Sequence, residues 1–390
     1  MSPVRDAAPR DRAARAALTR IAEPGDETVG GWVAEFGPAR VWEAVRENRR
    51  LPSASADRWA GLRLRAAGAS PERDLRVIAR LGGRFVCPGD REWPTQLDAL
   101  GPAGPLGLWV RGACSLRFLA LRSVAVVGAR ACTDYGAHVA AECAGALAER
   151  GWTVVSGAAH GIDAAAHRGA LAAGGPTVAV LACGVDVCYP AAHQELLRAV
   201  AERGLLLAEL PPGERPTRSR FVQRNRVIAA LTRGTVVVEA ARRSGSLNTA
   251  RHARRLGRHV MAVPGPVTSG LSAGTLGLLR QDAVPVGNAG QIIELVGEMG
   301  ELAEEAEAST VPRDLLAPQT GLVLDALPVS RPAEPAEVAR RACTSERDAL
   351  ARLHELSALG FVERVGDRWQ LRRGTGRHAE PGAHTAAAGG

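Results

Sequence analysis

Between residues 123 and 265, short apolar segments alternate with longer helix-like segments, and this alternation constrains the fold most. The apolar segments are SVAVVG (123–128), WTVVSG (152–157), TVAVLACG (177–184), LLLAEL (205–210), TVVVEA (235–240) and HVMAVPG (259–265). Helical patterns separate them; the one after an arginine-rich loop covers 222–231. Continuously apolar strands that alternate with helices are typical of a parallel sheet covered on both faces. The sequence therefore predicts an α/β fold with an extended Rossmann-like, mostly parallel sheet over residues 81–295.

The flanking sequence predicts two further modules. Residues 1–80 contain short apolar clusters separated by Gly and Pro, which indicate a small helical domain similar to SAM or helix-hairpin-helix domains. Five glutamates and no basic residue between 298 and 307 indicate an acidic linker over 296–315. Three helical patterns and a hairpin pattern around Gly366 follow, and they predict a winged-helix domain over 316–374. We expect residues 375–390 to be a disordered tail.

Composition excludes several classes of protein. The 390 residues carry a net charge of +8, and every basic residue is arginine, which excludes Schiff-base and P-loop lysine chemistry. The seven cysteines are scattered without zinc-ligand spacing, and we expect them to lie in a reducing cytoplasm. No segment is apolar over about 20 residues, so we expect no membrane span, no metal and a cytoplasmic protein.

Glycines follow several of the predicted strands, beside arginine, serine or histidine. The carboxyl ends of parallel strands converge on one crevice, and each of these glycines precedes a predicted helix whose free N–H groups can bind an anion. Tight turns alone explain any single glycine, but several together with arginine favour phosphate binding. GxGxxG and Walker motifs are both absent from the sequence. The residues concerned are Gly128, Arg130, Ser156, Gly157, His160, Gly161, Ser244, Gly245 and Ser246.

The strongest local charge lies between Arg215 and Arg258, where twelve arginines face a single acidic residue. Inside this stretch the run FVQRNRVIAAL places Arg224 and Arg226 in the first turn of a predicted helix, where cations oppose the helix dipole. A bound polyanion would remove that conflict. Phe221 precedes them, and an aromatic beside arginines is typical of single-strand binding. The alternatives are a core position for Phe221 and an ion pair of Arg224 with an acidic side chain, either Glu209 or Glu239.

Candidate catalytic groups are few. Asp163 and His167 lie four residues apart on one helix, and a triad with Ser156 or a metal pair would use them. We favour a structural interpretation, in which Asp163 caps the helix and His167 bonds to it. Glu239 ends a predicted central strand, where we expect it to hold an arginine in place. We therefore expect a binding protein and not an enzyme.

Six segments in order resemble the DprA/Smf family of DNA-processing proteins of natural transformation. They are VVGARACTDYG, VVSGAAHGIDAAAH, VAVLACGVDVCYP, FVQRNRVIAAL, VVVEAARRSGSLNTA and VMAVPGPV. The resemblance implies a homodimer that binds and protects incoming single-stranded DNA, loads RecA onto it, and needs no cofactor. The resemblance also implies binding residues beyond the strand-end set, some of them already noted in the arginine stretch. They are Phe221, Arg224, Asn225, Arg226 and Thr249.

Four positions depart from the family's motifs: Ala129 stands in place of Ser, His160 in place of Arg or Lys, Val222 in place of Pro, and Asn248 in place of Ile. The alternative function is an enzyme that processes nucleotides, because the region from Gly234 to Glu239 resembles the phosphoribohydrolases. The Pro-Gly-Gly that precedes Gly-Thr in those enzymes is missing here. A transcription regulator acting through the winged helix is a third class, but residues 332–373 carry a net charge of only +1.

Overall fold

The computed structural model describes residues 6–298, 316–329 and 331–372. The chain divides into two compact units, Met1–Glu304 and Glu305–Gly390, which we describe separately. The predicted acidic linker lies outside the described residues apart from positions 296–298, and the predicted tail lies wholly outside them. Among the described residues, no helix has the length and apolar character needed to cross a membrane.

The first unit is built on one sheet of nine strands, in the order β1-β2-β6-β5-β4-β3-β7-β8-β9. The strands β6, β5, β4, β3, β7, β8 and β9 run parallel to one another, whereas β1 and β2 form an antiparallel edge. The strands are β1 (Gly83–Val86), β2 (Leu108–Arg111), β3 (Ser123–Val127), β4 (Thr153–Ser156), β5 (Thr177–Leu181), β6 (Leu205–Ala208), β7 (Gly234–Val237), β8 (His259–Ala262) and β9 (Val284–Pro285).

The direction in which the chain crosses the sheet reverses beside β3. From β3 the chain passes through β4 and β5 to β6, and it then returns to place β7 on the other side of β3. Beyond β7 it continues outward to β8 and β9. The loops that follow β3 and β7 therefore leave in opposite directions, which opens a crevice at the carboxyl ends of these two strands.

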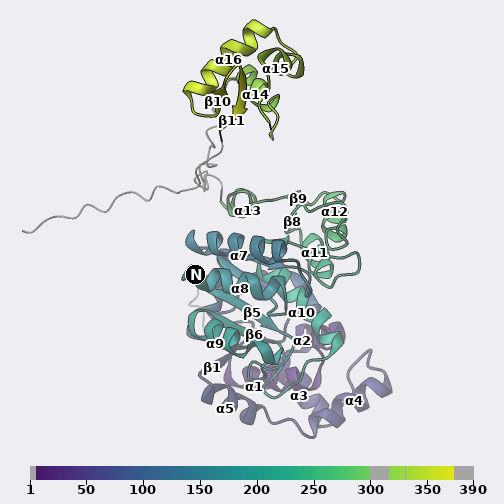
Figure 1. Cartoon of the computed structure of the whole chain (residues 1–390). Helices are drawn as coiled ribbons and strands as arrows, with labels where there is room; N and C mark the ends of the chain where they lie inside the picture. Colours follow the sequence, from purple (N-terminus) through teal and green to yellow (C-terminus); the bar gives the residue numbers. More distant parts are fainter. Residues whose placement is uncertain (1–5, 299–315, 330, 373–390) are drawn as a thin grey trace, which may run out of the picture. The chain divides into compact units, whose positions relative to one another are not determined.

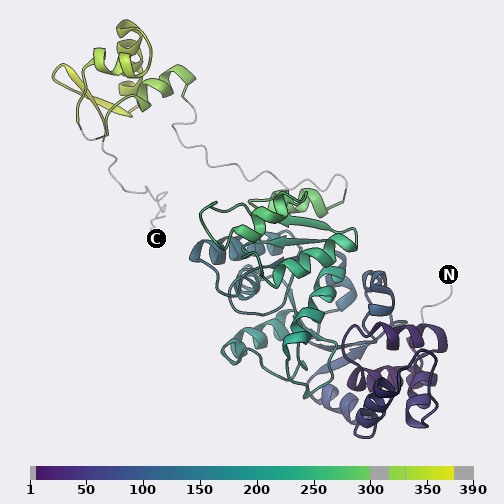
Figure 2. The same ribbon diagram turned by 90° about the vertical axis from the view of Figure 1, so that its right-hand side faces the viewer.

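Helices cover both faces of the sheet (Figures 1 and 2). One face packs against α7 (Asp134–Glu149), α8 (Ile162–Ala172), α9 (Gln194–Arg203) and α13 (Ala289–Val296). The other face packs against η1 (Thr95–Ala103), α6 (Leu116–Leu121), α10 (Arg218–Leu231), α11 (Ser246–Arg255) and α12 (Ala273–Leu279). The strands are apolar on both sides because both sides are covered, as the sequence predicted.

Five N-terminal helices pack at the antiparallel edge of the sheet. Ile78 of the last helix shares a core with Phe85 of β1 and Trp109 of β2, whose rings lie 4.6 Å apart. These helices belong to the same compact unit as the sheet. They are α1 (Pro9–Ile21), α2 (Glu27–Phe36), α3 (Pro38–Arg46), α4 (Ala56–Ala66) and α5 (Pro71–Arg80).

The second unit has the order of elements expected of a winged helix. Three helices, α14 (Pro318–Asp325), α15 (Pro335–Arg341) and α16 (Glu346–Ala358), precede the antiparallel pair β10 (Val362–Val365) and β11 (Arg368–Leu371). Its core includes Val338, Leu353 and Trp369. Gly366 has a φ of 62°, a left-handed value that suits the glycine of a tight hairpin turn.

The predicted α/β fold is confirmed, but one helix begins earlier than its pattern indicates. Helix α10 starts at Arg218 and not near Val222, because the hydroxyl of Thr217 accepts a hydrogen bond from the N–H of Arg220 and caps the helix. Arg224 and Arg226 therefore lie in the middle of the helix. The predicted conflict between their charge and the helix dipole is wrong, since that effect is confined to the first turn.

A histidine is buried between α8 and β5. Nδ1 of His167 lies 2.8 Å from the hydroxyl of Thr177, and that hydroxyl donates to the carbonyl of Val154. The hydroxyl proton is thus already used, so Nδ1 carries the imidazole proton and donates it to Thr177. Burial lowers the pKa of His167 from 6.5 to about 3, so the ring is neutral in the folded protein at pH 7.

This burial predicts a specific loss of stability in acid. The folded-state pKa of His167 is depressed, so between pH 6.5 and about 3 the unfolded chain binds a proton that the folded chain does not. The free energy of unfolding should therefore fall as the pH drops through this window. Urea unfolding at pH 7, 5 and 4 should show a smaller fall for His167→Gln than for the wild type. Gln in place of His138, an exposed histidine on α7, is the control, and an equal fall in all three proteins would contradict the prediction.

Candidate functional site

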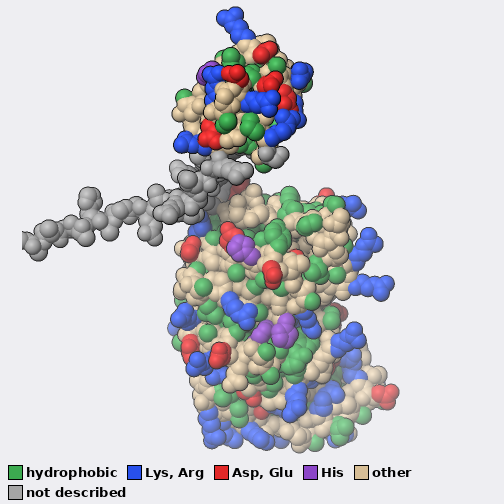
Figure 3. Space-filling view, viewed as in Figure 1, with side chains coloured by type: hydrophobic (Ala, Val, Ile, Leu, Met, Phe, Trp, Pro, Cys, Tyr) green, Lys and Arg blue, Asp and Glu red, His purple; other side chains and the backbone are tan. Residues whose placement is uncertain are grey.

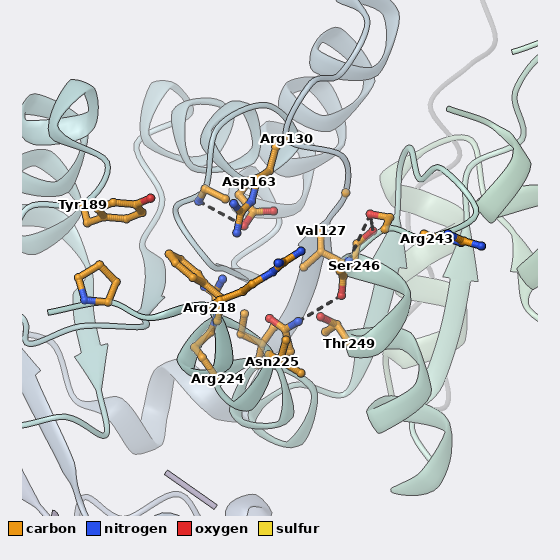
Figure 4. Close-up of a pocket in the computed structure, with 18 of the residues that line it drawn as sticks. Val127, Arg130, Asp163, Tyr189, Arg218, Arg224, Asn225, Arg243, Ser246 and Thr249 are labelled. Carbon is orange, nitrogen blue, oxygen red and sulfur yellow. Dashed lines mark hydrogen bonds between the residues drawn. The ribbon is translucent and has the colours of Figure 1, made fainter. Parts of the chain in front are cut away.

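A cavity of about 730 Å³ opens at the carboxyl ends of the parallel strands, beside the point where the strand order reverses. Its lining comes from the loops after β3, β4, β5, β6 and β7, from the first three turns of α10 and from the first turn of α11. Figure 4 shows these side chains converging from the separate elements. The cavity therefore occupies the place where open α/β sheets bind their ligands.

The lining of this pocket is strongly basic. It contains four arginines and one aspartate, which gives it a net charge of +3. Arg130, Arg218 and Arg243 are exposed, and no described residue forms a hydrogen bond or ion pair with their guanidinium groups. All three line the cavity, although the side chain of Arg243 extends away from the other two (Figure 4). Cations around one cavity with no acidic partner among the described residues favour an anionic ligand.

One of these arginines stacks on an aromatic side chain. The guanidinium of Arg130 lies over the ring of Phe221, 4.8 Å from its centroid. The ring of Tyr189 lies beside Phe221, with 5.5 Å between their centroids, and Tyr189 is 43% exposed. The pocket thus presents a flat charged group and two aromatic faces side by side, which is a suitable surface for both phosphate and base.

The fourth arginine, Arg224, is buried at the floor of the pocket. Its Nη1 donates to the carbonyl of Val180 at 2.6 Å, and Nε has no hydrogen-bond partner among the described residues. The guanidinium packs directly on the backbone of Gly157, where a β-carbon would lie 1.8 Å from Nη1. Gly157 therefore serves as a seat for Arg224. Burial lowers the pKa of Arg224, while the charge of Asp163 acts in the opposite direction.

Asp163 fixes the loop between β4 and α8. Its carboxylate accepts hydrogen bonds from the backbone N–H groups of Gly157 and Ala159, at 3.2 and 3.3 Å. Burial raises the pKa of Asp163, whereas the charge of Arg224 and these hydrogen bonds lower it. Gly161 completes the loop with a φ of 74°, and a β-carbon there would lie 2.3 Å from the carbonyl of Ala129. Glycine is therefore required where the loops after β3 and β4 meet.

The opposite wall of the pocket is the start of α11. The side-chain amide of Asn225 donates to the carbonyl of Gly245 at 3.2 Å, which ties this loop to α10. The hydroxyls of Ser244 and Ser246 lie 2.7 Å apart, and Thr249 lines the pocket one turn further along. The first N–H groups of α11 already donate to Ser244 and Gly245, so this wall offers hydroxyl groups to a ligand and not free N–H donors.

A smaller hollow of about 40 Å³ adjoins the pocket behind Phe221. Gly157 and His160 line it, and Arg130, Tyr189 and Phe221 separate it from the pocket. His160 contacts the ring of His193 edge-on, with 4.6 Å between their centroids. Nδ1 of His193 lies 3.0 Å from the carbonyl of Ala158, and burial lowers the pKa of His193.

The structure brings most of the predicted site residues together. Nine of them line the pocket: Gly128, Arg130, Phe221, Arg224, Asn225, Ser244, Gly245, Ser246 and Thr249. Two more, Gly157 and His160, line the adjoining hollow. Ser156, Gly161 and Arg226 line neither cavity.

Two of these three expectations need correction. The side chain of Arg226 is 4% exposed and forms an ion pair with Glu209, which follows β6. The charge of Arg226 is therefore neutralised by the protein itself and not by a bound polyanion. The hydroxyl of Ser156 is fully buried and donates to the carbonyl of Val126, so it joins β4 to β3 and is not available to a ligand.

The structural interpretations of the acidic residues also need correction. His167 bonds to Thr177 and not to Asp163, while Asp163 accepts from the loop that precedes α8. None of the described arginines pairs with Glu239; its carboxylate accepts from the N–H and the hydroxyl of Thr133, the residue that caps α7. Among the described residues, no group of three or more His, Cys, Asp or Glu side chains could hold a metal ion.

Sequence reasoning missed Tyr189, Arg218, Arg243 and Asp163 as pocket residues. The two arginines lie within the arginine stretch but not in a predicted strand-end motif. Tyr189 was detectable, because it is one of only two tyrosines and follows the third strand of the alternating region. Asp163 was recognised only as a candidate acid or helix cap, because its place beside the buried Arg224 cannot be read from the sequence.

Comparison with known proteins identifies similar sequences over nearly the whole chain. The family described as DNA recombination-mediator protein A matches residues 84–297. A Mycobacterium tuberculosis protein assigned as a DNA processing protein DprA is 44% identical over 94% of this chain and 96% of its own length. The protein Smf of Escherichia coli is 36% identical over 74% of this chain and 78% of its own length.

A solved structure of a similar protein has the same architecture. The X-ray structure of DNA processing protein A from Streptococcus pneumoniae superposes with a TM-score of 0.63 at 29% identity, covering 76% of this chain and 100% of that one. Helices and sheet of this chain therefore follow the architecture of that protein.

The ion pair of Arg226 with Glu209 predicts a large effect on stability. Replacing Arg226 by Ala leaves a buried carboxylate without its partner, which should lower the free energy of unfolding by about 3–5 kcal/mol. The double variant Glu209→Leu/Arg226→Leu removes both charges and should recover most of that loss. Urea unfolding at pH 7 measures both. If Arg226→Ala is as stable as the wild type but binds less ligand, the structural role of Arg226 is contradicted and a role in ligand binding is favoured.

Proposed function

The chain belongs to the DNA recombination-mediator protein A family, and on that premise we propose that its strand-end pocket binds single-stranded DNA. The observation that carries the proposal is the stack of Arg130 on Phe221 beside unpartnered arginines in a cavity of about 730 Å³. Phosphate and base are the two chemical parts of a single strand, and this surface has a group suited to each.

The phosphates would meet the arginines. Arg130, Arg218 and Arg243 stand on three different elements around the cavity, so a backbone that passes through it reaches more than one of them. Guanidinium groups bind phosphate oxygens through charge-assisted hydrogen bonds. The single aspartate in the lining faces Arg224 and two backbone N–H groups, so it adds little repulsion.

The bases would meet the aromatic faces. Tyr189 is exposed and Phe221 is half-buried in the pocket wall, so each leaves part of its ring accessible. A base can stack on such a ring only when it is free of its own helical stack, which favours single over double strands. Stacking also tolerates any base, so we expect little sequence preference.

A second part of the proposal follows from the family. We propose that the chain acts as a homodimer that protects the bound strand and passes it to RecA. The description of the family as a recombination mediator supports this role. RecA filament assembly on strands coated with single-strand-binding protein should be faster in the presence of this protein, and Arg130→Ala should remove that gain.

We also propose that the pocket is not an active site. The acids nearest to it are engaged: Asp163 holds its loop, and Glu239 accepts two hydrogen bonds from Thr133. Glu239 corresponds to the carboxylate that a phosphoribohydrolase would need, and it does not line the cavity. Neither acid is placed as a free general base for the attack of water.

The proposed phosphate contacts predict that binding depends on salt. Three arginines that neutralise phosphates should give a slope of log K against log salt of about −2, because single strands release about 0.7 counterion per phosphate. Arg130→Ala should lower the affinity roughly tenfold and make this slope shallower by about 0.7. Fluorescence anisotropy with a labelled short oligonucleotide at several salt concentrations measures both.

Phe221→Ala separates stacking from charge. It should weaken binding by about 1–3 kcal/mol and leave the salt slope nearly unchanged, because a stacked base releases no counterion. Because Arg130 rests on Phe221, the double variant should lose less than the sum of the two single losses. Binding that is insensitive to salt, or unaffected by both substitutions, would contradict the proposed function.

The enzyme alternative has its own test. Purified protein should release no free base from nucleoside monophosphates over hours of incubation. Turnover that is present in the wild type and abolished in Glu239→Gln would overturn the proposal and favour the phosphoribohydrolase alternative.

A further inference from the structure

Helix α11 leads away from the pocket and carries arginines along its exposed side. Ser246 and Thr249 line the pocket at its start, and the helix ends at Arg255. At 1.5 Å per residue, its far end lies roughly 14 Å from its first residue. A ligand that extends beyond the pocket in this direction would run along the helix.

Two of these arginines form a ridge. Arg251 and Arg255 are exposed, and their spacing of four residues places them on one face of α11. No described residue forms a hydrogen bond or ion pair with either, whereas Arg254 donates to the side chain and the backbone of Gln281. Two like charges at this spacing destabilise a helix, so the ridge is unfavourable for the free protein.

The sequence on both sides of the ridge is free of acidic residues. Residues 240–281 include seven arginines and no aspartate or glutamate. Figure 3 shows basic side chains projecting from the edge of the first unit where α11 and α12 lie. Burial lowers the pKa of His252, half-buried on α11, and the charges of Arg255, Arg226 and Arg251 lower it further. Like charge of this kind attracts a polyanion.

We propose that the ridge, Arg251 and Arg255, binds the phosphate backbone of the DNA strand where it leaves the pocket along α11. This inference rests on the proposed function of the pocket and extends it. Residues 240–281 contain no Phe, Tyr or Trp, so α11 and the segments next to it in the sequence offer no aromatic ring to a base. The ridge therefore contributes charge alone, and it guides the strand without reading its sequence.

The experiment compares oligonucleotides of two lengths, about 6 and about 16 nucleotides, within the range that a single-strand site covers. For the longer strand, Arg251→Ala/Arg255→Ala should make the salt slope shallower by about 1.4, two phosphates at 0.7 each. If the variant and the wild type bind equally at 1 M salt, the affinity of the variant at 0.1 M salt should be roughly 25-fold lower than that of the wild type. The shorter strand, held by the pocket, should bind the double variant as tightly as it binds the wild type.

The matched control is Arg76→Ala/Arg80→Ala. These arginines are also exposed and four residues apart on one helix, but α5 packs against β1 at the opposite edge of the sheet. The control removes the same charge and should leave both strands bound as in the wild type. Equal losses in the control and the ridge variant would show a general charge effect and overturn the inference.

The remaining outcomes separate the two proposals. If the longer strand binds the ridge variant with an unchanged slope while Arg130→Ala still weakens both strands, the ridge inference fails and the pocket stands. If Arg130→Ala weakens neither strand, the proposed function of the pocket fails, whatever the ridge variant does.

Discussion

The buried charge of Arg224 is the interaction on which the geometry of the pocket depends. Its guanidinium lies on the backbone of Gly157, donates to the carbonyl of Val180 and faces the carboxylate of Asp163. A buried cation is stable only when such groups surround it, so the ends of β4 and β5 and the start of α8 are fixed around α10. Asp163 in turn holds the loop that Gly161 completes against the end of β3. The exposed arginines of the pocket stand on this scaffold.

The arginines of the basic stretch divide into structural and available groups. Arg220 pairs with Glu23 and Glu214, and Arg226 pairs with Glu209, so both join elements of the first unit. The exposed arginines of the stretch whose guanidinium groups have no hydrogen-bond or ion-pair partner among the described residues are Arg215, Arg218, Arg242, Arg243, Arg251 and Arg255. The arginines that remain free to bind a ligand therefore lie around the pocket and along α11. They are fewer than the total number of arginines in the stretch indicates.

The sequence predicts the sheet well because strands buried on both faces must be apolar throughout, and glycines follow where those strands end. Five of the nine predicted pocket residues follow from the same strand-end pattern. The other four, Phe221, Arg224, Asn225 and Thr249, come from the arginine stretch and the family resemblance. It is less reliable for ion pairs. Glu209 was considered as a partner of Arg224 but pairs with Arg226, and Glu23, which lies between α1 and α2 and pairs with Arg220, is too distant in the sequence to be recognised. Ser156 fails differently, since nothing in a strand-end Ser-Gly shows whether the hydroxyl faces a neighbouring strand or a ligand.

The most direct test of the account is to find which residues touch the bound strand. The wild-type protein can be irradiated with an oligonucleotide that contains iodouracil, and the crosslinked peptides identified by mass spectrometry. The account predicts crosslinks at Phe221 and Tyr189, whose rings lie together in the pocket wall. Efficient crosslinking confined to the second unit or to the N-terminal helices, with none at these two rings, would contradict it.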